Sequence, residues 1–127
     1  MLDAMLDDLR LLVETESPSD DRDALMRSAE VLARIITERL GPGVELIEGP
    51  AGPHVRWRSS ADPKVLVLGH PDTVFPLGAL ERRPFAVEGD RATGPGVFDM
   101  KAGIVQAIWG VAASGRSSSV EVLFSCD

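Results

Sequence analysis

Two short segments of this 127-residue chain hold the residue types that metal chemistry uses, and the first contains His70. His70 directly follows the apolar run 65–68, and Asp72 stands two residues further on. A metal-bound imidazole keeps its orientation when a nearby carboxylate binds its other ring nitrogen. The spacing therefore suits a metal ligand with its orienting partner, although an isolated His-x-Asp pair is more often a loop histidine beside a turn residue.

The second segment, residues 94–103, has Gly94 and Gly96 before Asp99 and runs into an apolar stretch. The glycines allow a tight turn, and a carboxylate at the start of a helix is commonly an N-cap, the simplest interpretation of Asp99 alone. The segment also resembles a dinucleotide-binding loop. That interpretation fails because Asp99 stands in place of the third glycine and no strand leads directly into the segment.

Together the two segments predict more than either does alone, since open α/β sheets build their sites beyond the carboxyl ends of their strands. His70 and Asp99 are 29 residues apart, and each follows an element that would converge on the same sheet edge. A two-metal site needs a carboxylate shared by both ions and an imidazole on at least one of them. We therefore expect His70 and Asp99 to meet as metal ligands, with Asp72 beside His70.

The rest of the pattern predicts an α/β fold, a sheet with helices on both faces. Apolar residues at helical spacing predict helices over residues 2–13, from about 21 to 40, and for about fifteen residues from near Met100. Ser19 or Asp20 is expected to cap the second helix. The predicted strands are Val44–Ile47, His54–Arg58, Val65–Leu68 and Val120–Phe124, with a hairpin over residues 85–93. The last two strands are apolar enough to be buried on both faces.

Composition limits the partners and the compartment. Twenty acidic against thirteen basic residues give a net charge of −7, which argues against nucleic acid or an anionic membrane as partner. A single cysteine excludes an internal disulfide. The longest apolar stretch, Ile104–Ala113, is too short to span a bilayer, and the N-terminus lacks the basic region of a signal peptide. The expected location is cytoplasmic, and the length suits one domain.

With these motifs in place, the chain resembles the zinc-dependent exopeptidase and deacylase family. That family contains glutamate carboxypeptidase (carboxypeptidase G), acetylornithine deacetylase, succinyl-diaminopimelate desuccinylase and aminoacylase. The matching stretches, in order, are Ser17-Pro18-Ser19, Gly69–Val74, Gly94–Gly103 and the terminal Phe124-Ser125-Cys126-Asp127. The second and third are highly specific for the family, and the third looks most like the glutamate carboxypeptidase branch.

The resemblance implies roles for three residues. His70 would bind one zinc ion, Asp99 would bridge two, and Asp72 would be the catalytic-site aspartate that orients His70. The Asp99–Met100 peptide bond would be cis. The implied cofactor is zinc, two ions per intact site, with cobalt or manganese as alternatives. The implied substrate is a small peptide or N-acyl amino acid, and the longer enzyme would be a homodimer.

The chain departs from the family at its end, because it stops at Asp127, one residue before the family's Glu-Glu pair. In the family the first glutamate of that pair is the general base and the second binds zinc. The remaining ligands and the lid domain lie further downstream. We therefore expect residues 1–127 to be the N-terminal portion of a metallopeptidase catalytic domain and inactive alone. The alternatives are a non-catalytic truncated domain that acts as a folding or interaction module, and a nucleotide-binding α/β domain.

Five other residues are expected to have structural roles. His54 has no matching partner in the motifs, and Cys126 ends a strand as a small apolar filler. Lys101 is expected to neutralise acidic charge near Asp99 rather than to take part in catalysis. The two tryptophans fall on strand and helix patterns and are predicted to be core residues; they are Trp57 and Trp109.

Overall fold

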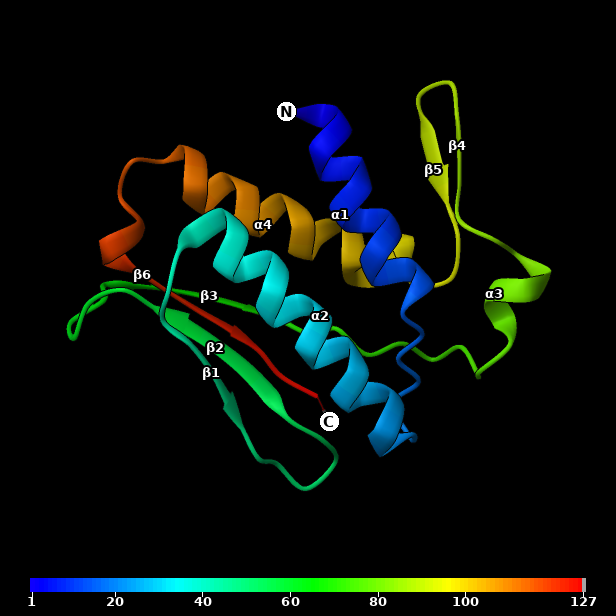
Figure 1. The fold of residues 1–127 in the computed structure, drawn as a ribbon, viewed down its shortest axis with the longest axis horizontal. Helices are drawn as coiled ribbons and strands as arrows, with labels where there is room; N and C mark the ends of the chain where they lie inside the picture. Colours follow the sequence, from blue (N-terminus) through cyan, green and yellow to red (C-terminus); the bar gives the residue numbers. More distant parts are fainter. Residues whose placement is uncertain (127) are drawn as a thin grey trace.

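The computed structural model describes residues 1–126, so the terminal match at Asp127 lies outside the described residues. Its helices are α1 (Leu2–Glu14), α2 (Arg22–Leu40), α3 (Ala79–Arg82) and α4 (Ala102–Ala113). Its strands are β1 (Val44–Ile47), β2 (His54–Arg58), β3 (Val65–Gly69), β4 (Ala86–Glu88), β5 (Arg91–Thr93) and β6 (Val120–Phe124). A kinked turn at Val97–Lys101 precedes α4, and a short helical turn at Ser117–Ser119 precedes β6 (Figure 1).

Four strands form one mixed sheet in the order β1-β2-β6-β3. The pairs β1–β2 and β2–β6 are antiparallel, while β3 and β6 are parallel with Val67 opposite Val122. Parallel strands need a long crossover connection, and here α4 lies within it. The α/β class is therefore confirmed. The strands β4 and β5 form a separate antiparallel hairpin that projects from the body of the molecule, as the sequence predicts (Figure 1).

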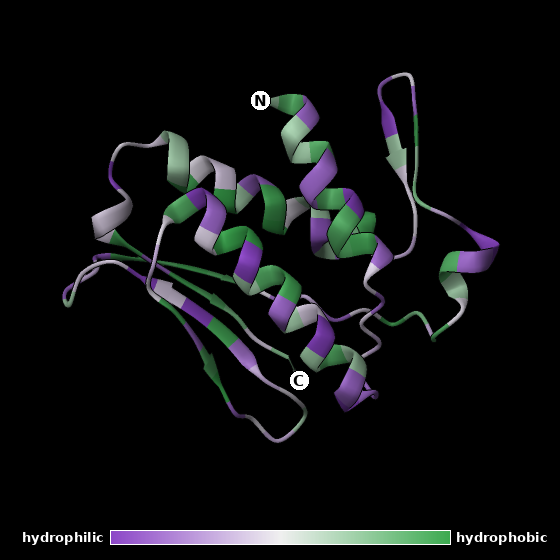
Figure 2. Ribbon diagram, viewed as in Figure 1, coloured by the Kyte–Doolittle hydropathy of each residue, from purple (hydrophilic) through white to green (hydrophobic). Residues whose placement is uncertain are grey.

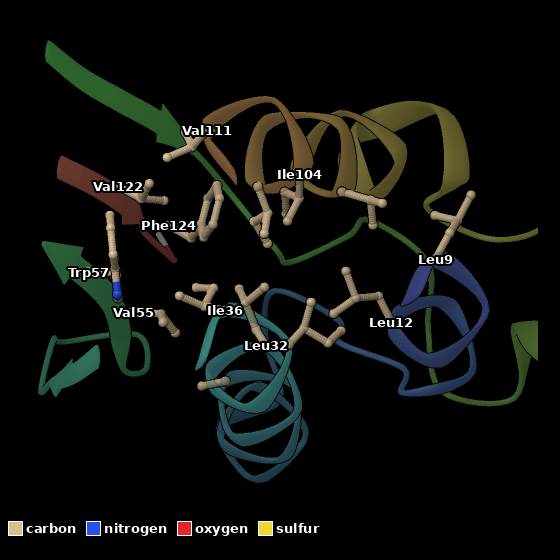
Figure 3. Close-up of a cluster of buried hydrophobic side chains, with 14 of the residues drawn as sticks. Leu9, Leu12, Leu32, Ile36, Val55, Trp57, Ile104, Val111, Val122 and Phe124 are labelled. Atoms are coloured by element: carbon tan, nitrogen blue, oxygen red, sulfur yellow. The ribbon is translucent and has the colours of Figure 1, made fainter. Parts of the chain in front are cut away.

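The hydrophobic core lies between one face of the sheet and the helices α1, α2 and α4 (Figure 3). Alternate residues of β2 and β6 point into it, since side chains alternate between the faces of a strand. Helix α2 presents hydrophobic bands between hydrophilic ones (Figure 2). Trp57 is fully buried, which confirms it as a core residue, whereas Trp109 is partly buried and packs against the edge of the cluster. The most buried members are Leu12, Leu32, Ile36, Val55, Trp57, Ile104, Ile108 and Val122.

The other face of the sheet is open in the described part of the chain. Leu66 and Leu68 of β3 lie opposite Glu121 and Leu123 of β6, and the two β3 leucines are 56% and 61% exposed. The prediction that β3 is buried on both faces is wrong for residues 1–126. The expectation of helices on both faces is likewise not met there, because α1, α2 and α4 share one core. In β6 buried and partly exposed residues alternate, so burial on both faces is not found in that strand either.

Two local features differ from prediction. Asp21, rather than Ser19 or Asp20, caps α2, because its Oδ1 accepts a hydrogen bond from the Ala24 amide at 2.9 Å. The helix α3 falls in a stretch without any helical pattern and spans only four residues. No helix in residues 1–126 is both long and apolar enough to cross a membrane.

A polar cluster joins three helices beside the core. The Asp8 carboxylate accepts hydrogen bonds from Arg39 Nε at 2.9 Å, Arg39 Nη2 at 3.0 Å and Trp109 Nε1 at 2.9 Å. The Arg39 guanidinium also stacks over the Trp109 ring, 4.7 Å from its centroid. The hydrogen bonds to Asp8 raise the pKa of Arg39 above its usual value. The cluster therefore fixes α1 against both α2 and α4.

Candidate functional site

His70 follows β3 directly at the carboxyl end of the parallel pair. Its main-chain amide donates a hydrogen bond to Met100 Sδ at 3.3 Å, which ties the strand end to the turn before α4. The side chain is 43% exposed. The sheet therefore presents an accessible imidazole at the edge where sequence reasoning expects a site.

Asp99 lies in the kinked turn that leads into α4. Gly96 has φ +81°, and the Lys101 amide donates to the Gly96 carbonyl at 2.9 Å, which closes the turn. The Asp99–Met100 peptide bond is cis, so that expectation is confirmed. The Asp99 side chain is 77% exposed, and neither the turn nor α4 has a side-chain cap. The N-cap interpretation of Asp99 is therefore wrong.

The two predicted ligands meet in the structure. His70 Nε2 lies 3.1 Å from Asp99 Oδ1. Two ligands held at zinc–ligand distances of about 2.0–2.1 Å in a tetrahedral site are about 3.3 Å apart, so both atoms can face one ion. Residues 1–126 nevertheless contain no group of three or more histidine, cysteine or acidic side chains that could hold a metal. The donor set present fits part of a zinc site.

Asp72 lies on the other side of the imidazole. His70 Nδ1 is 3.1 Å from the main-chain oxygen of Asp72 and 3.5 Å from its carboxylate Oδ1. The expected contact is present, but the main-chain oxygen is the nearer acceptor. The Asp72 side chain is only 7% exposed, while the imidazole it touches is much more open to solvent. With Nδ1 as donor to Asp72, the Nε2 lone pair is left for an ion held between Nε2 and Asp99 Oδ1.

Both predicted ligands line an open pocket of about 520 Å³. Its wall carries two apolar side chains that are almost fully exposed, Val74 at 90% and Phe98 at 99%. The Arg83 guanidinium also lines the pocket and stacks over the Phe75 ring, 4.7 Å from its centroid. The sequence pattern does not indicate these pocket residues, because a lone exposed arginine or phenylalanine carries no periodic signal.

Lys101 has a different environment from the one expected. It is 1% exposed, and its ammonium donates to the main-chain oxygens of Leu12 at 2.8 Å and Thr15 at 3.1 Å. Burial lowers the pKa of Lys101 to about 8, with Glu16 acting in the opposite direction. The ammonium therefore holds the carboxyl end of α1, and its hydrogen bonds go there instead of to Asp99.

The remaining chemistry-bearing residues lie at the end of β6. His54 Nδ1 is 2.9 Å from Ser125 Oγ, and the half-buried imidazole is not among the pocket residues. Cys126 is buried, as a small filler should be, and its thiol donates to the Pro53 carbonyl at 3.3 Å. These contacts fit the structural roles expected for both residues.

The fold of this chain is found as part of larger solved peptidase structures. The chain has the fold of the M20 family metallo-carboxypeptidase Sso-CP2 from Sulfolobus solfataricus, with a TM-score of 0.76 and 19% identity over 94% of this chain and 29% of that one. It also has the fold of the di-peptidase Dug1p from Saccharomyces cerevisiae, with a TM-score of 0.65 and 17% identity over 96% and 31% of the two chains.

In sequence the chain is related to carboxypeptidase G2 from Pseudomonas sp. (strain RS-16), with 28% identity over 107 residues. That match covers 79% of this chain and 25% of the relative. No protein-family model matches the chain. The chain is thus related to the M20 metallo-peptidases and spans between a quarter and a third of the length of these relatives.

Proposed function

We propose that this chain is the N-terminal portion of the catalytic domain of a zinc-dependent hydrolase. The longer enzyme would cleave the amide bond of small peptides or N-acyl amino acids, most like a glutamate carboxypeptidase. The observation that carries the proposal is the approach of His70 Nε2 and Asp99 Oδ1 to 3.1 Å in an open pocket at the carboxyl end of β3. Imidazole nitrogen and carboxylate oxygen are both zinc ligands.

In this proposal His70 and Asp99 would hold zinc. Zinc, or cobalt or manganese in its place, supplies polarisation of the scissile carbonyl and activation of water. Asp72 holds the His70 ring through Nδ1 so that Nε2 faces the ligand position. Val74 and Phe98 offer apolar surface beside the ligands, where a substrate side chain can lie.

The chain alone is proposed to be inactive. Catalytic zinc takes about three protein ligands and a water. The part of the chain that the structure describes offers no group of three. A second candidate function is a non-catalytic interaction module. The lack of a three-residue metal-binding group in the described residues favours it, as does the match to only 25% of the length of carboxypeptidase G2.

Hydrolysis assays and zinc calorimetry test the proposal together. The purified chain, with or without zinc, should not hydrolyse dipeptides or N-acylglutamates. The product of the complete reading frame that contains residues 1–127 should hydrolyse them and lose the activity with a chelator. A complete product that binds no zinc and cleaves neither substrate would contradict the proposal. A stop codon directly after Asp127 would favour the interaction module, whereas a Glu-Glu pair would favour the enzyme.

Sub-micromolar binding of two zinc ions by the 127-residue chain would overturn the claim that its site is incomplete. Binding of a single ion, or only weak binding, would support that claim.

A further inference from the structure

The connection between α1 and α2 lies against the loop that carries His70 and Asp72 (Figure 1). The Thr73 amide donates to the Ser17 carbonyl at 2.8 Å, and the Ser19 amide donates to the Thr73 carbonyl at 3.0 Å. These bonds form a parallel bridge between Pro18 and Thr73. The Ser-Pro-Ser segment is therefore fixed beside the site, although more than fifty residues separate the two in sequence.

The two serine hydroxyls have different acceptors. Ser17 Oγ, which is buried, donates to the Pro71 carbonyl at 2.8 Å. Ser19 Oγ lies 2.5 Å from Asp72 Oδ2 and 3.1 Å from the Thr73 carbonyl. A hydroxyl has one proton to donate, and a charged acceptor at the shorter distance forms the stronger bond. The proton of Ser19 therefore goes to the Asp72 carboxylate.

This bond determines how the Asp72 carboxylate faces His70. With Oδ2 held by Ser19, the other oxygen, Oδ1, lies 3.5 Å from His70 Nδ1. The Asp72 side chain is 7% exposed, so water has little access to replace a lost hydroxyl. Without Ser19 the carboxylate is free to rotate about its last torsion, which leaves Nδ1 with the main-chain oxygen of Asp72 alone.

We propose that Ser19 is a positioning residue of this site, whose hydroxyl fixes the Asp72 carboxylate and thereby the tautomer and ring orientation of His70. The importance of Ser19 for metal binding rests on the proposed function. The effect of Ser19 on His70 does not depend on the proposed function, because the contacts from Ser19 to Asp72 and from Asp72 to His70 exist in the chain without a metal. The inference also gives the Ser17-Pro18-Ser19 segment a role at the site, whereas the sequence suggested only that Ser19 could cap the following helix.

The test compares Ser19→Ala with Ser19→Thr, which keeps a hydroxyl, and with Ser60→Ala. Ser60 Oγ donates to the Ser118 carbonyl at 2.6 Å, and neither residue lines the pocket. Ser60→Ala therefore controls for the loss of a serine hydroxyl away from the site. The readout is the ¹⁵N NMR spectrum of the His70 ring in the metal-free chain under mildly alkaline conditions, in which free imidazoles are neutral. Thermal unfolding checks that each variant is folded.

The wild-type chain and Ser19→Thr should have the same share of the Nδ1–H tautomer of His70, which the Asp72 oxygens at Nδ1 favour and Asp99 Oδ1 at Nε2 opposes. Ser19→Ala should have a smaller share of the Nδ1–H tautomer, because the Asp72 carboxylate is no longer held toward Nδ1, and Ser60→Ala should match the wild type. Ser19→Cys, which keeps the size of serine but offers only a weak donor, should shift the spectrum in the same direction if the alanine variant does not fold. In calorimetry, zinc binding to Ser19→Ala should be about 10–100-fold weaker than to the wild type.

Unchanged ring signals in folded Ser19→Ala or Ser19→Cys would overturn the inference. A tautomer change in a chain that binds no zinc would support Ser19 as a positioning residue while contradicting the proposed metal site. The two proposals therefore fail separately.

Discussion

His70 Nε2 and Asp99 Oδ1 lie 3.1 Å apart, although 29 residues separate them in sequence. The end of β3 supplies the imidazole, and the turn before α4 supplies the carboxylate. A side chain on Gly96 would lie 2.6 Å from Thr73 Cγ2, so the two loops are in close contact beside the pair. The separation of the two candidate ligands thus depends on how closely these loops pack.

Replacing Asp99 tests whether the pair binds zinc. Asp99→Asn keeps the size of the side chain but removes its negative charge, and an amide oxygen is a much poorer zinc ligand than a carboxylate. We expect zinc binding at least about tenfold weaker in calorimetry, an estimate from the usual cost of disturbing a metal site. Asp90→Asn, in the exposed turn of the hairpin, is the matched control and should bind zinc as the wild type does. Equal affinity of Asp99→Asn and wild type would count against the site.

Gly96→Ala should disturb the loop contact itself. Gly96 and Gly78 both have positive φ, +81° and +94°, so alanine is strained at either position. Only at Gly96 does the new Cβ meet another residue, since nothing lies within 4 Å of one at Gly78. Gly96→Ala should therefore lower the free energy of unfolding by at least about 1 kcal/mol more than Gly78→Ala in urea titrations. An equal decrease in the free energy of unfolding for the two variants would show that the contact with Thr73 does not destabilise Gly96→Ala.

The meeting of His70 and Asp99 could be predicted because it follows from chain order. The apolar strand β3 ends directly before His70, and the carboxyl ends of strands in an α/β sheet gather at one edge. The fine contacts were not predictable. Ser19 is a good N-cap by type, but its hydroxyl donates to Asp72, so Asp21 caps α2 instead. Nothing local in the sequence indicates a hydroxyl–carboxylate bond across 53 residues.

The open face of the sheet shows a second limit. Residues 65–68 are apolar on both faces of the strand. Such a pattern does not show which other parts of the chain cover each face. Leu66 and Leu68 face away from the helices and are more than half exposed, because nothing in residues 1–126 packs on them closely. Burial there depends on groups outside the strand, so the strand's own pattern could not decide it.

The Asp8 cluster should contribute more to stability than any exposed ion pair in the described chain. Asp8→Ala leaves the Arg39 guanidinium and the Trp109 N–H without their acceptor in a site where the Asp8 side chain is 7% exposed. Arg39 is itself 26% exposed, so water recovers part of the loss. We expect a decrease of about 2–3 kcal/mol in the free energy of unfolding, below the full cost of breaking a buried pair.

The control for Asp8 is Glu14→Ala. Glu14 is about half exposed and reaches Arg10 at 3.9 Å on the same helix, so its removal should change stability by less than about 0.5 kcal/mol. Chemical denaturation of the two variants gives the comparison directly. A loss for Asp8→Ala no larger than that for Glu14→Ala would mean that the cluster is not a stabilising connection between the helices.

Stability should rise with pH as Lys101 loses its proton. Burial lowers the pKa of Lys101 from 10.5 to about 8, so between these values the unfolded chain binds more protons than the folded chain. The free energy of unfolding therefore increases with pH between about 8 and 10.5, by up to about 3 kcal/mol. Below about pH 8 Lys101 contributes no pH dependence, because it is protonated in both states. Urea unfolding of the wild type and of Lys101→Met from pH 7 to 10.5 should show the rise only in the wild type. Lys64→Met, which removes an exposed lysine paired with Asp62, should keep the rise, whereas the same slope in Lys101→Met would assign it to another group.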